Sequence, residues 1–381
     1  MSAVGAAAPD KPGRERFLSL DVFRGLTIFV MILVNTAGPG AASYAQLSHT
    51  KWFGFTLADL VFPTFLFVTG NALAFTAGGG SERDFLLRTG KRAALIFLCG
   101  FLMYWYPFVH QAADGGWAFN AFGQTRVMGV LQRIALCYFA GALAVRYLPL
   151  RALPVLAIGL LLAYWGILYG FGAAGAELDK LGNAGTRLDL WLLGRDHLYR
   201  KDGGFDPEGV LGTLPAIVNV IGGFLAGRFL MTAGKTPRAV RLMLTAGVAL
   251  VLLALAWHPL FPIAKKLWTG SFVLLTVGLD LLLLGACVGW IELGGHAGGS
   301  SFFTAMGKNP LAIYLFSELF VVTLQLVRVA PGMGLYDWVG ISVFQALTPG
   351  PLGSFLCALA YTLACWALAW WLDRRRIYIR L

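Results

Sequence analysis

The residues of this chain that are best suited to chemistry lie in and beside its first two apolar segments. His49 lies between these segments, and Asp59 follows where the second one begins. An imidazole that a carboxylate orients, with the amide of Asn35 nearby, is a suitable general base for activating a hydroxyl or an amine. Two plainer interpretations stay open: a single loop histidine is often a surface residue, and Asp59 could merely cap the helix that it begins.

The first apolar segment, residues 17–36, carries three polar side chains on one helical face. At 100° per residue, Arg24 lies within roughly 20° of Asn35, and Asp21 lies within roughly 40° of it. Such groups are costly beside lipid, so this face is expected to form one wall of a slot inside a helical bundle. Alternatively, Asp21 and Arg24 simply neutralise each other.

Two arginines mark the fourth apolar segment, residues 127–148. Arg126 and Arg133 are seven residues apart and are therefore expected on one helical face. With Gln132 beside them, two guanidinium groups about 10 Å apart could bind an anionic ligand that reaches into the bundle. Arg126 could instead extend along the helix to the outer interface.

Charged and amide residues also flank or enter the later apolar segments. In the sequence GKNP, Lys308 and Asn309 open a helix whose Gly and Pro mark a start suited to anion binding. Each of the acidic residues could also serve only in a structural ion pair. These acidic residues are Asp206, Glu208, Asp280 and Glu318.

The composition requires that most of the chain lie in a membrane. Of 381 residues, 58% are hydrophobic and only 13% are charged, against roughly 25% charged in an ordinary soluble domain. Apolar runs long enough to cross a hydrocarbon core of roughly 30 Å recur throughout. We therefore predict an all-α, polytopic helical bundle. Its ten expected spans cover residues 17–36, 57–77, 87–108, 127–148, 153–171, 210–231, 240–257, 271–291, 309–327 and 353–372.

The positive charges indicate the topology. With both termini in the cytoplasm, 17 Lys and Arg residues lie in cytoplasmic segments and 9 in outer ones, which agrees with the positive-inside rule. The formal net charge of +11 is thus explained without a nucleic-acid partner. The five cysteines lie in apolar runs and show neither a disulfide nor a metal-ligand spacing. We predict a cytoplasmic leader at residues 1–16 and a single membrane domain at 17–381, with a long outer loop at about 172–209.

Five sequence motifs resemble those of a family of transmembrane acyltransferases. They are RFLSLDVFRGLTIFVMILVN at residues 16–35, HTKWFGFTLADLVFPTFLFVTG at 49–70, GVLQRIALCYF at 129–139, DPEGVLGTLPAIVNVIGGFLAG at 206–227 and GKNPLAIYLFSEL at 307–319. The family includes heparan-α-glucosaminide N-acetyltransferase and the bacterial NagX proteins, and the chain resembles NagX most. The motifs occur in the order of the family, and the first two are the most specific.

The resemblance implies transfer of an acetyl group from cytoplasmic acetyl-CoA to an amino sugar, glucosamine or N-acetylglucosamine, on the periplasmic side of a bacterial inner membrane. The catalytic histidine of the family falls on His49, and its neighbouring amide and carboxylate fall on Asn35 and Asp59. A homodimer embedded in lipid, with no metal, is expected from the family.

We expect His49 to take a proton from the acceptor while Asn35 donates to the developing oxyanion. The acetyl-CoA site is predicted to comprise Asp21, Arg24, Gln132, Arg133, Lys308 and Asn309. The sugar site is predicted to comprise Trp52, Asp206 and Glu208. Direct transfer and a route through an acetylated His49 both fit these residues, as do an amine and a hydroxyl acceptor.

Two other classes of protein compete with this hypothesis. A secondary transporter of a sugar or sugar derivative also places Arg and Asp residues in its spans. Transporters often show inverted repeats or paired broken helices, and the sequence shows neither. A structural membrane subunit whose buried charges only pair with one another would leave His49 and Asn35 unexplained.

Overall fold

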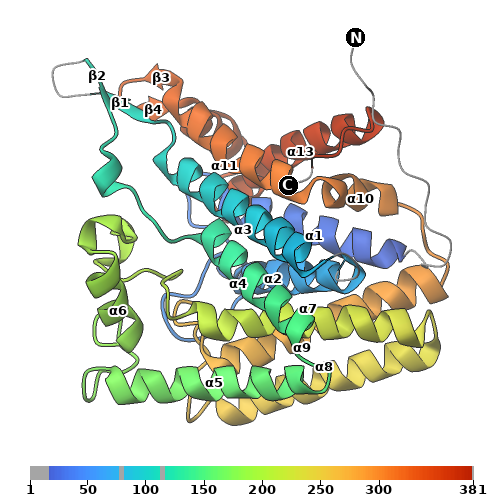
Figure 1. Cartoon of the computed structure of the whole chain (residues 1–381). Helices are drawn as coiled ribbons and strands as arrows, with labels where there is room; N and C mark the ends of the chain where they lie inside the picture. The colour runs from blue at the N-terminus through green and yellow to red at the C-terminus, as the bar shows by residue number, and fades with distance from the viewer. Residues whose placement is uncertain (1–16, 77–80, 112–115, 380–381) are drawn as a thin grey trace.

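The computed structural model describes residues 17–76, 81–111 and 116–379, and most of these residues are helical. Two short β-hairpins lie in the connections (Figure 1). They are formed by β1 (Val109–Gln111) with β2 (Trp117–Phe119) and by β3 (Arg328–Ala330) with β4 (Met333–Gly334). The predicted all-α, polytopic bundle is confirmed. Its helices are α1 (Leu18–Asn35), α2 (Leu57–Thr76), α3 (Glu82–Trp105), α4 (Val130–Tyr147), α5 (Ala152–Phe171), α6 (Ala184–Leu192), α7 (Thr213–Ala233), α8 (Pro237–Trp257), α9 (Gly270–Cys287), α10 (Ser300–Lys308), α11 (Pro310–Leu326), α12 (Leu335–Val339) and α13 (Pro351–Arg374).

Seven helices in the described part of the chain are long and apolar enough to cross a membrane. They are α1, α2, α5, α7, α8, α9 with its π-helical extension (Val288–Leu293), and α13. Together, α10 and α11 form an eighth candidate, although they are bent by 83° at Asn309. The two other predicted spans correspond to α3 and α4, which are not among these helices. The count of ten spans therefore stays a prediction.

One helix lies at the centre of the bundle and two lie at its edge. In α2, 72% of the apolar window is buried, against 22% in both α5 and α8. At the centre, α7 packs extensively against α2. Around this pair, α1 packs against α10, and α3 packs against α4. The exposed leucine and valine side chains of α5 and α8 are suited to contact with hydrocarbon.

Glycines allow two of these helix pairs to approach at the level of their backbones. A Cβ atom on Gly223 of α7 would lie 1.8 Å from the carbonyl oxygen of Phe67 in α2. A Cβ atom on Gly25 of α1 would lie at the same distance from the carbonyl oxygen of Phe303 in α10. Membrane helices associate through such close packing because lipid supplies little hydrophobic driving force between them.

The central pair of helices should therefore not tolerate a methyl group at Gly223. We expect Gly223→Ala to force α2 and α7 apart and to lower the free energy of unfolding by about 1–3 kcal/mol. The measurement is the thermal unfolding midpoint of purified protein in detergent. Gly166→Ala in α5 is the matched control, because a Cβ there meets nothing within 4 Å and alanine favours a helix. Equal losses in the two variants would contradict the close packing.

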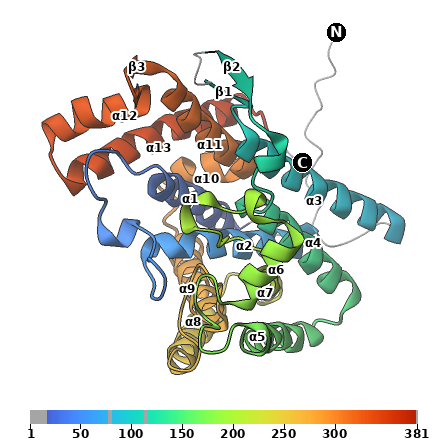
Figure 2. The same cartoon turned by 90° about the vertical axis from the view of Figure 1, so that its left-hand side faces the viewer.

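Four interhelical connections meet at one end of the bundle and form what we call the loop layer, which comprises residues 36–56, 116–129, 172–212 and 258–269. Figure 1 shows this end on the left, with α6, and Figure 2 shows it face on. Hydrogen bonds join its members. Gly54 N–H donates to the Ile263 carbonyl (2.8 Å), and Val127 N–H donates to the His197 carbonyl (3.1 Å). The loop layer thus brings together residues that lie up to about two hundred positions apart in the sequence.

Candidate active site

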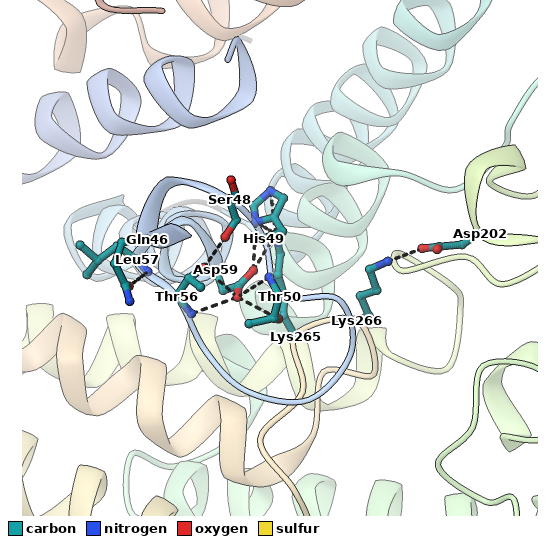
Figure 3. Close-up of polar contacts among 10 residues, drawn as sticks. All are labelled: Gln46, Ser48, His49, Thr50, Thr56, Leu57, Asp59, Asp202, Lys265 and Lys266. Atoms are coloured by element: carbon teal, nitrogen blue, oxygen red, sulfur yellow. Dashed lines mark hydrogen bonds and ion pairs between the residues drawn. The ribbon is translucent and has the colours of Figure 1, made fainter. Parts of the chain in front are cut away.

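The Asp59 carboxylate holds together the loop that carries His49 (Figure 3). It lies in the first turn of α2 and is fully buried. Its Oδ1 lies 2.9 Å from Nδ1 of His49. Its Oδ2 accepts from the backbone N–H and hydroxyl of Thr50 (3.3 and 3.0 Å) and of Thr56 (both 3.1 Å). Asp59 therefore both contacts the imidazole and closes the start of α2, as in a capping box.

A lysine that was not expected from the sequence completes this cluster. The Lys265 ammonium lies 2.9 Å from Nδ1 and 3.2 Å from Nε2 of His49, and 3.6 Å from Oδ1 of Asp59. The His49 side chain is 42% exposed, so its ring is open to a ligand although its two charged neighbours are not. In the sequence, Lys265 is recognisable only as one of the positive charges of an outer loop. Nothing in the sequence shows that residues 258–269 cross the His49 loop.

A second polar cluster in the loop layer surrounds Arg126. Its Nε and Nη2 bind both carboxylate oxygens of Asp206 at 2.9 and 2.5 Å, and Nη2 also lies 2.5 Å from Oε2 of Glu208. The guanidinium is sandwiched by the rings of Tyr104 and Tyr199, at 5.0 and 4.6 Å. Arg126 thus forms buried ion pairs and does not extend to the interface.

The charges around Glu208 decide its ionisation. Burial alone raises the pKa of the Glu208 carboxyl, but Arg126, Arg133 and Lys265 hold that pKa below its ordinary value. Glu208 therefore links the Arg126 cluster electrostatically to Lys265 and, through it, to His49.

The predicted common helical face of Arg126 and Arg133 is wrong, because α4 begins only at Val130.

Removing the Arg126 charge should destabilise the loop layer in a pH-dependent manner. We expect Arg126→Gln to lower the free energy of unfolding by about 3–5 kcal/mol at neutral pH, because two buried carboxylates lose their partner. Because the pKa of Glu208 is lower in the folded protein than in the unfolded chain, its ion pair stabilises the folded protein fully above the pKa of the unfolded chain. This stabilisation is lost as the pH falls through the pKa of the folded protein. Thermal unfolding at roughly pH 8 and pH 4 should therefore show the larger loss at roughly pH 8.

The control for this experiment is Arg200→Gln in the same loop layer. Arg200 is exposed and donates to the carbonyl and side chain of Gln124 at 3.0 and 3.3 Å. Its loss should change stability by less than about 0.5 kcal/mol at either pH. A loss for Arg126→Gln that does not depend on pH would contradict the assigned role of the carboxylates.

Asn35 has a different partner from the one expected. It lies at the C-terminal end of α1, where its amide donates to Oε1 of Glu318 in α11 at 3.1 Å. Within the described residues, no hydrogen bond joins Asn35 to His49 or Asp59. Glu318 interacts electrostatically with Tyr104, whose hydroxyl lies 3.3 Å from Arg126. Asn35 and Glu318 therefore belong to the surroundings of the Arg126 cluster.

The polar face of α1 continues from Asn35 toward the opposite end of the bundle. Arg24 pairs with Asp21 at 3.4 Å and points to the Gly307 carbonyl at the same distance. It also interacts with the like charge of Arg92 in α3. The stripe thus faces α10 and α11, and Asp21 and Arg24 do pair, as the plainer interpretation had it.

The GKNP residues have structural partners near the C-terminus. The Lys308 ammonium binds both carboxylate oxygens of Asp373 at 2.7 and 2.9 Å. The buried Asn309 side chain donates to the Ile377 carbonyl at 2.9 Å and accepts from the Ile379 N–H at 2.8 Å. Lys308 therefore ties the last turn of α13, and Asn309 ties the segment that follows it, to the bend between α10 and α11.

Gln132 and Arg133 are buried in α4. Arg133 donates to the Gly209 carbonyl at 2.8 Å and lies over the ring of Trp268 at 5.0 Å. Its Nε and Nη1 atoms, and both amide atoms of Gln132, have no hydrogen-bond partner in the described part of the chain. Arg133 thus contacts the segments that precede α7 and α9. Within the described residues, these contacts do not involve α1, which carries Asp21 and Arg24 of the predicted acetyl-CoA site.

Trp52 fastens the His49 loop to the connection that carries α6. Its indole N–H donates to the Leu178 carbonyl at 3.0 Å, and its ring meets the edge of Phe205 at 5.0 Å. The Lys180 ammonium lies 5.7 Å from the same ring. The Trp52 side chain is half-buried, and its contacts hold the His49 loop against residues 172–212.

The convergent side chains of the loop layer are acid–base groups. All five cysteines are free thiols. Among residues 17–76, 81–111 and 116–379, no three His, Cys, Asp or Glu side chains come close enough together to hold a metal ion. An imidazole held by a carboxylate and flanked by an ammonium group is suited to proton transfer and to binding a polar ligand.

The fold and this site define a multi-pass helical membrane protein with a histidine–aspartate pair at one end of its bundle. Residues 16–172 match the family model described as heparan-alpha-glucosaminide N-acetyltransferase, catalytic. The chain is 26% identical to the Homo sapiens heparan-alpha-glucosaminide N-acetyltransferase over 364 residues, which covers 80% of this chain and 53% of the human protein. The Mus musculus protein of the same name is also 26% identical, with 80% and 54% covered.

The chain is thus similar to the heparan-α-glucosaminide N-acetyltransferases, through residues 16–172 in the family model and over 80% of its length in the two relatives. The matched family region contains Asn35, His49 and Asp59. The chain spans about half the length of these two relatives. The resemblance inferred from the motifs is thereby confirmed for the family, whereas the closer resemblance to NagX stays a prediction.

Proposed function

We propose that this chain is a transmembrane acetyltransferase that moves an acetyl group from acetyl-CoA to an amino sugar. The observation that carries the proposal is the contact of 2.9 Å between a half-exposed imidazole and the buried Asp59 carboxylate. When Nδ1 of His49 donates to the carboxylate, Nε2 is the nitrogen that can accept a proton. The names of the relatives support the acetyl group and the glucosaminide acceptor.

The proposed reaction needs one base and one oxyanion donor. Nε2 of His49 takes a proton from the acceptor amine or hydroxyl as that group attacks the thioester carbonyl carbon. A new C–N or C–O bond forms, the C–S bond breaks, and the imidazolium returns the proton to the departing thiolate. The Asn35 amide is proposed to donate to the carbonyl oxygen as negative charge develops there, which requires a ligand to lie between Asn35 and His49.

The polar face of α1 is the proposed binding surface for the acyl donor. Its charged end, with Arg24 and the nearby Arg92, offers two cations to the phosphate groups of a CoA molecule. Its other end carries Asn35 beside Glu318. The unpartnered polar atoms of Gln132 and Arg133 support their place in the same proposal, while Lys308 and Asn309 would contribute through the bend that they stabilise.

The acceptor is proposed to bind within the loop layer. Trp52 offers a half-buried aromatic ring, and Glu208 offers a carboxylate that its cationic neighbours keep ionised. Asp206, by contrast, is buried and fully engaged by Arg126 and by backbone N–H groups of Tyr199 and Glu208. We therefore assign Asp206 the role of placing Arg126 and Glu208 for the sugar.

His49 should be essential for acetyl transfer. We expect His49→Ala to lower the transfer rate by about 10²–10⁴-fold, because a positioned general base contributes that much. The measurement uses sealed vesicles with labelled acetyl-CoA on one face and glucosamine or N-acetylglucosamine on the other. His110→Ala is the matched control, since His110 is exposed and contacts Asn120 of the loop layer. Label that never reaches a sugar, or that His49→Ala transfers as well as wild type, would contradict the proposal.

Arg24 should affect binding of the donor more than the chemical step. We expect Arg24→Gln to raise KM for acetyl-CoA by about tenfold, the loss of roughly one charge-assisted hydrogen bond, with kcat changed much less. Arg241→Gln is the control, because Arg241 is exposed near the start of α8. A kcat defect with unchanged KM in Arg24→Gln would place Arg24 outside the donor site.

One observation favours a second candidate, a secondary transporter of a sugar. The helix pair α10 and α11 is broken by 83°, and transporters often build their binding sites on broken helices. The vesicle assay separates the two candidates. Sugar that crosses the membrane without acquiring label would indicate transport.

The orientation and assembly of the chain complete the proposal. We propose that the loop layer faces the periplasm of a bacterial cell and that both termini face the cytoplasm, since this topology satisfies the positive-inside rule. A homodimer surrounded by inner-membrane lipid follows from the family resemblance. Protease accessibility of the loop layer in right-side-out vesicles tests the orientation.

A further inference from the structure

The position of Lys265 beside the His49–Asp59 pair is not used by the reaction described above. Its ammonium contacts both ring nitrogens of His49 and lies 3.6 Å from the Asp59 carboxylate. The neighbouring Lys266 points elsewhere and binds Asp202 at 2.5 Å (Figure 3). Two adjacent lysines thus have different partners, and only Lys265 meets the imidazole.

The backbone around Lys265 holds its ammonium in place. Gly54 pairs with Ala264 in a β-bridge, so the His49 loop and the Lys265 loop are joined one residue away from Lys265. The Lys265 carbonyl accepts from the Trp268 N–H at 2.9 Å, and Trp268, which is fully buried, has a positive φ of 56°. The Lys265 side chain is only 13% exposed. The ammonium is therefore fixed by the fold rather than by chance contact at a surface.

The proton inventory of this cluster constrains His49. Oδ2 of Asp59 accepts two backbone N–H groups, from Thr50 and Thr56, so Asp59 is a carboxylate. Nδ1 of His49 cannot donate to Asp59 and accept from Lys265 at once. The Asp59 carboxylate faces both His49 and Lys265. Because the Lys265 ammonium lies about 3 Å from the ring, it opposes a second positive charge on His49.

We propose that Lys265 is a positioning residue that disfavours a positive charge on His49, with Nδ1–H directed to Asp59 and the unprotonated Nε2 beside the Lys265 ammonium. The inference deepens the proposed function, on which it rests, by assigning the group that sets the proton affinity of the base. Without Lys265, the Asp59 carboxylate would be the charged group facing the ring and would favour the imidazolium. With Lys265, a proton taken from the acceptor is destabilised on His49 and passes on to the thiolate.

The other charges that face this cluster act on Lys265. Burial lowers the pKa of Lys265, while Asp59 of α2 and Glu208 of the loop layer oppose that shift and Lys266 adds to it. Asp202 neutralises Lys266. The charged groups that face His49 directly are therefore Asp59 and Lys265, and their effects on the imidazole have opposite signs.

The test measures the protonation of His49 without requiring acetyl transfer. Diethyl pyrocarbonate modifies neutral imidazole, so the pH dependence of its reaction with His49, followed by peptide mass spectrometry of the full-length protein in detergent, gives a titration midpoint. We expect Lys265→Gln to raise this midpoint by about one pH unit or more and Asp59→Asn to lower it. Lys265→Arg should restore the wild-type midpoint, and Lys266→Gln should leave it unchanged.

The outcomes separate this inference from the proposed function. Shifts of opposite sign for Lys265→Gln and Asp59→Asn support it, because loss of folded structure cannot produce them. An unchanged midpoint in Lys265→Gln, and in Lys265→Met measured in parallel, overturns it and leaves Lys265 as a structural ion pair. The acidic limb of the acetyl-transfer rate should move with the labelling midpoint. A chain that transfers no acetyl group overturns the proposed function. The labelling midpoints decide independently whether Lys265 affects the protonation of His49.

Discussion

The Asp59 carboxylate is shielded from water at the first turn of α2, where protein groups replace its hydration. Both oxygens are engaged, one by His49 and the other by the N–H and hydroxyl groups of Thr50 and Thr56. A buried carboxylate is tolerated only when it is paired and hydrogen-bonded in this way. The need to satisfy Asp59 therefore fixes the path of the loop, the direction of the imidazole and, with Lys265, the contact between two distant connections.

The helical architecture could be predicted because its physical cause is local. A charged fraction of 13% and recurrent apolar runs leave hydrogen-bonded helices as the means of crossing lipid, and each predicted span coincides with a helix. The break at Asn309 was not predicted as a bend of 83°. Apolar periodicity shows that a segment is helical, but it does not show how two short helices are held at an angle by the segment beyond α13.

The candidate site could be predicted in part, since His49 and Asp59 lie ten residues apart on one loop. The sequence also contains the capping signal TLAD at residues 56–59, which ties Asp59 to Thr56. The contact of Lys265 with His49 and that of Glu318 with Asn35 were not predicted, because they depend on tertiary packing between segments more than two hundred residues apart. Arg126 was placed on α4 by periodicity, whereas its two buried carboxylates hold it in the connection before that helix.

The central claim is that a donor lying along α1 delivers its reactive end to the imidazole that Asp59 holds. The most direct measurement is an experimental structure of the protein with a non-transferable thioether analogue of acetyl-CoA. The account predicts the nucleotide near Arg24 and the acetyl end within roughly 4 Å of Nε2 of His49. A nucleotide bound in the loop layer, or an acetyl end directed away from His49, would contradict it.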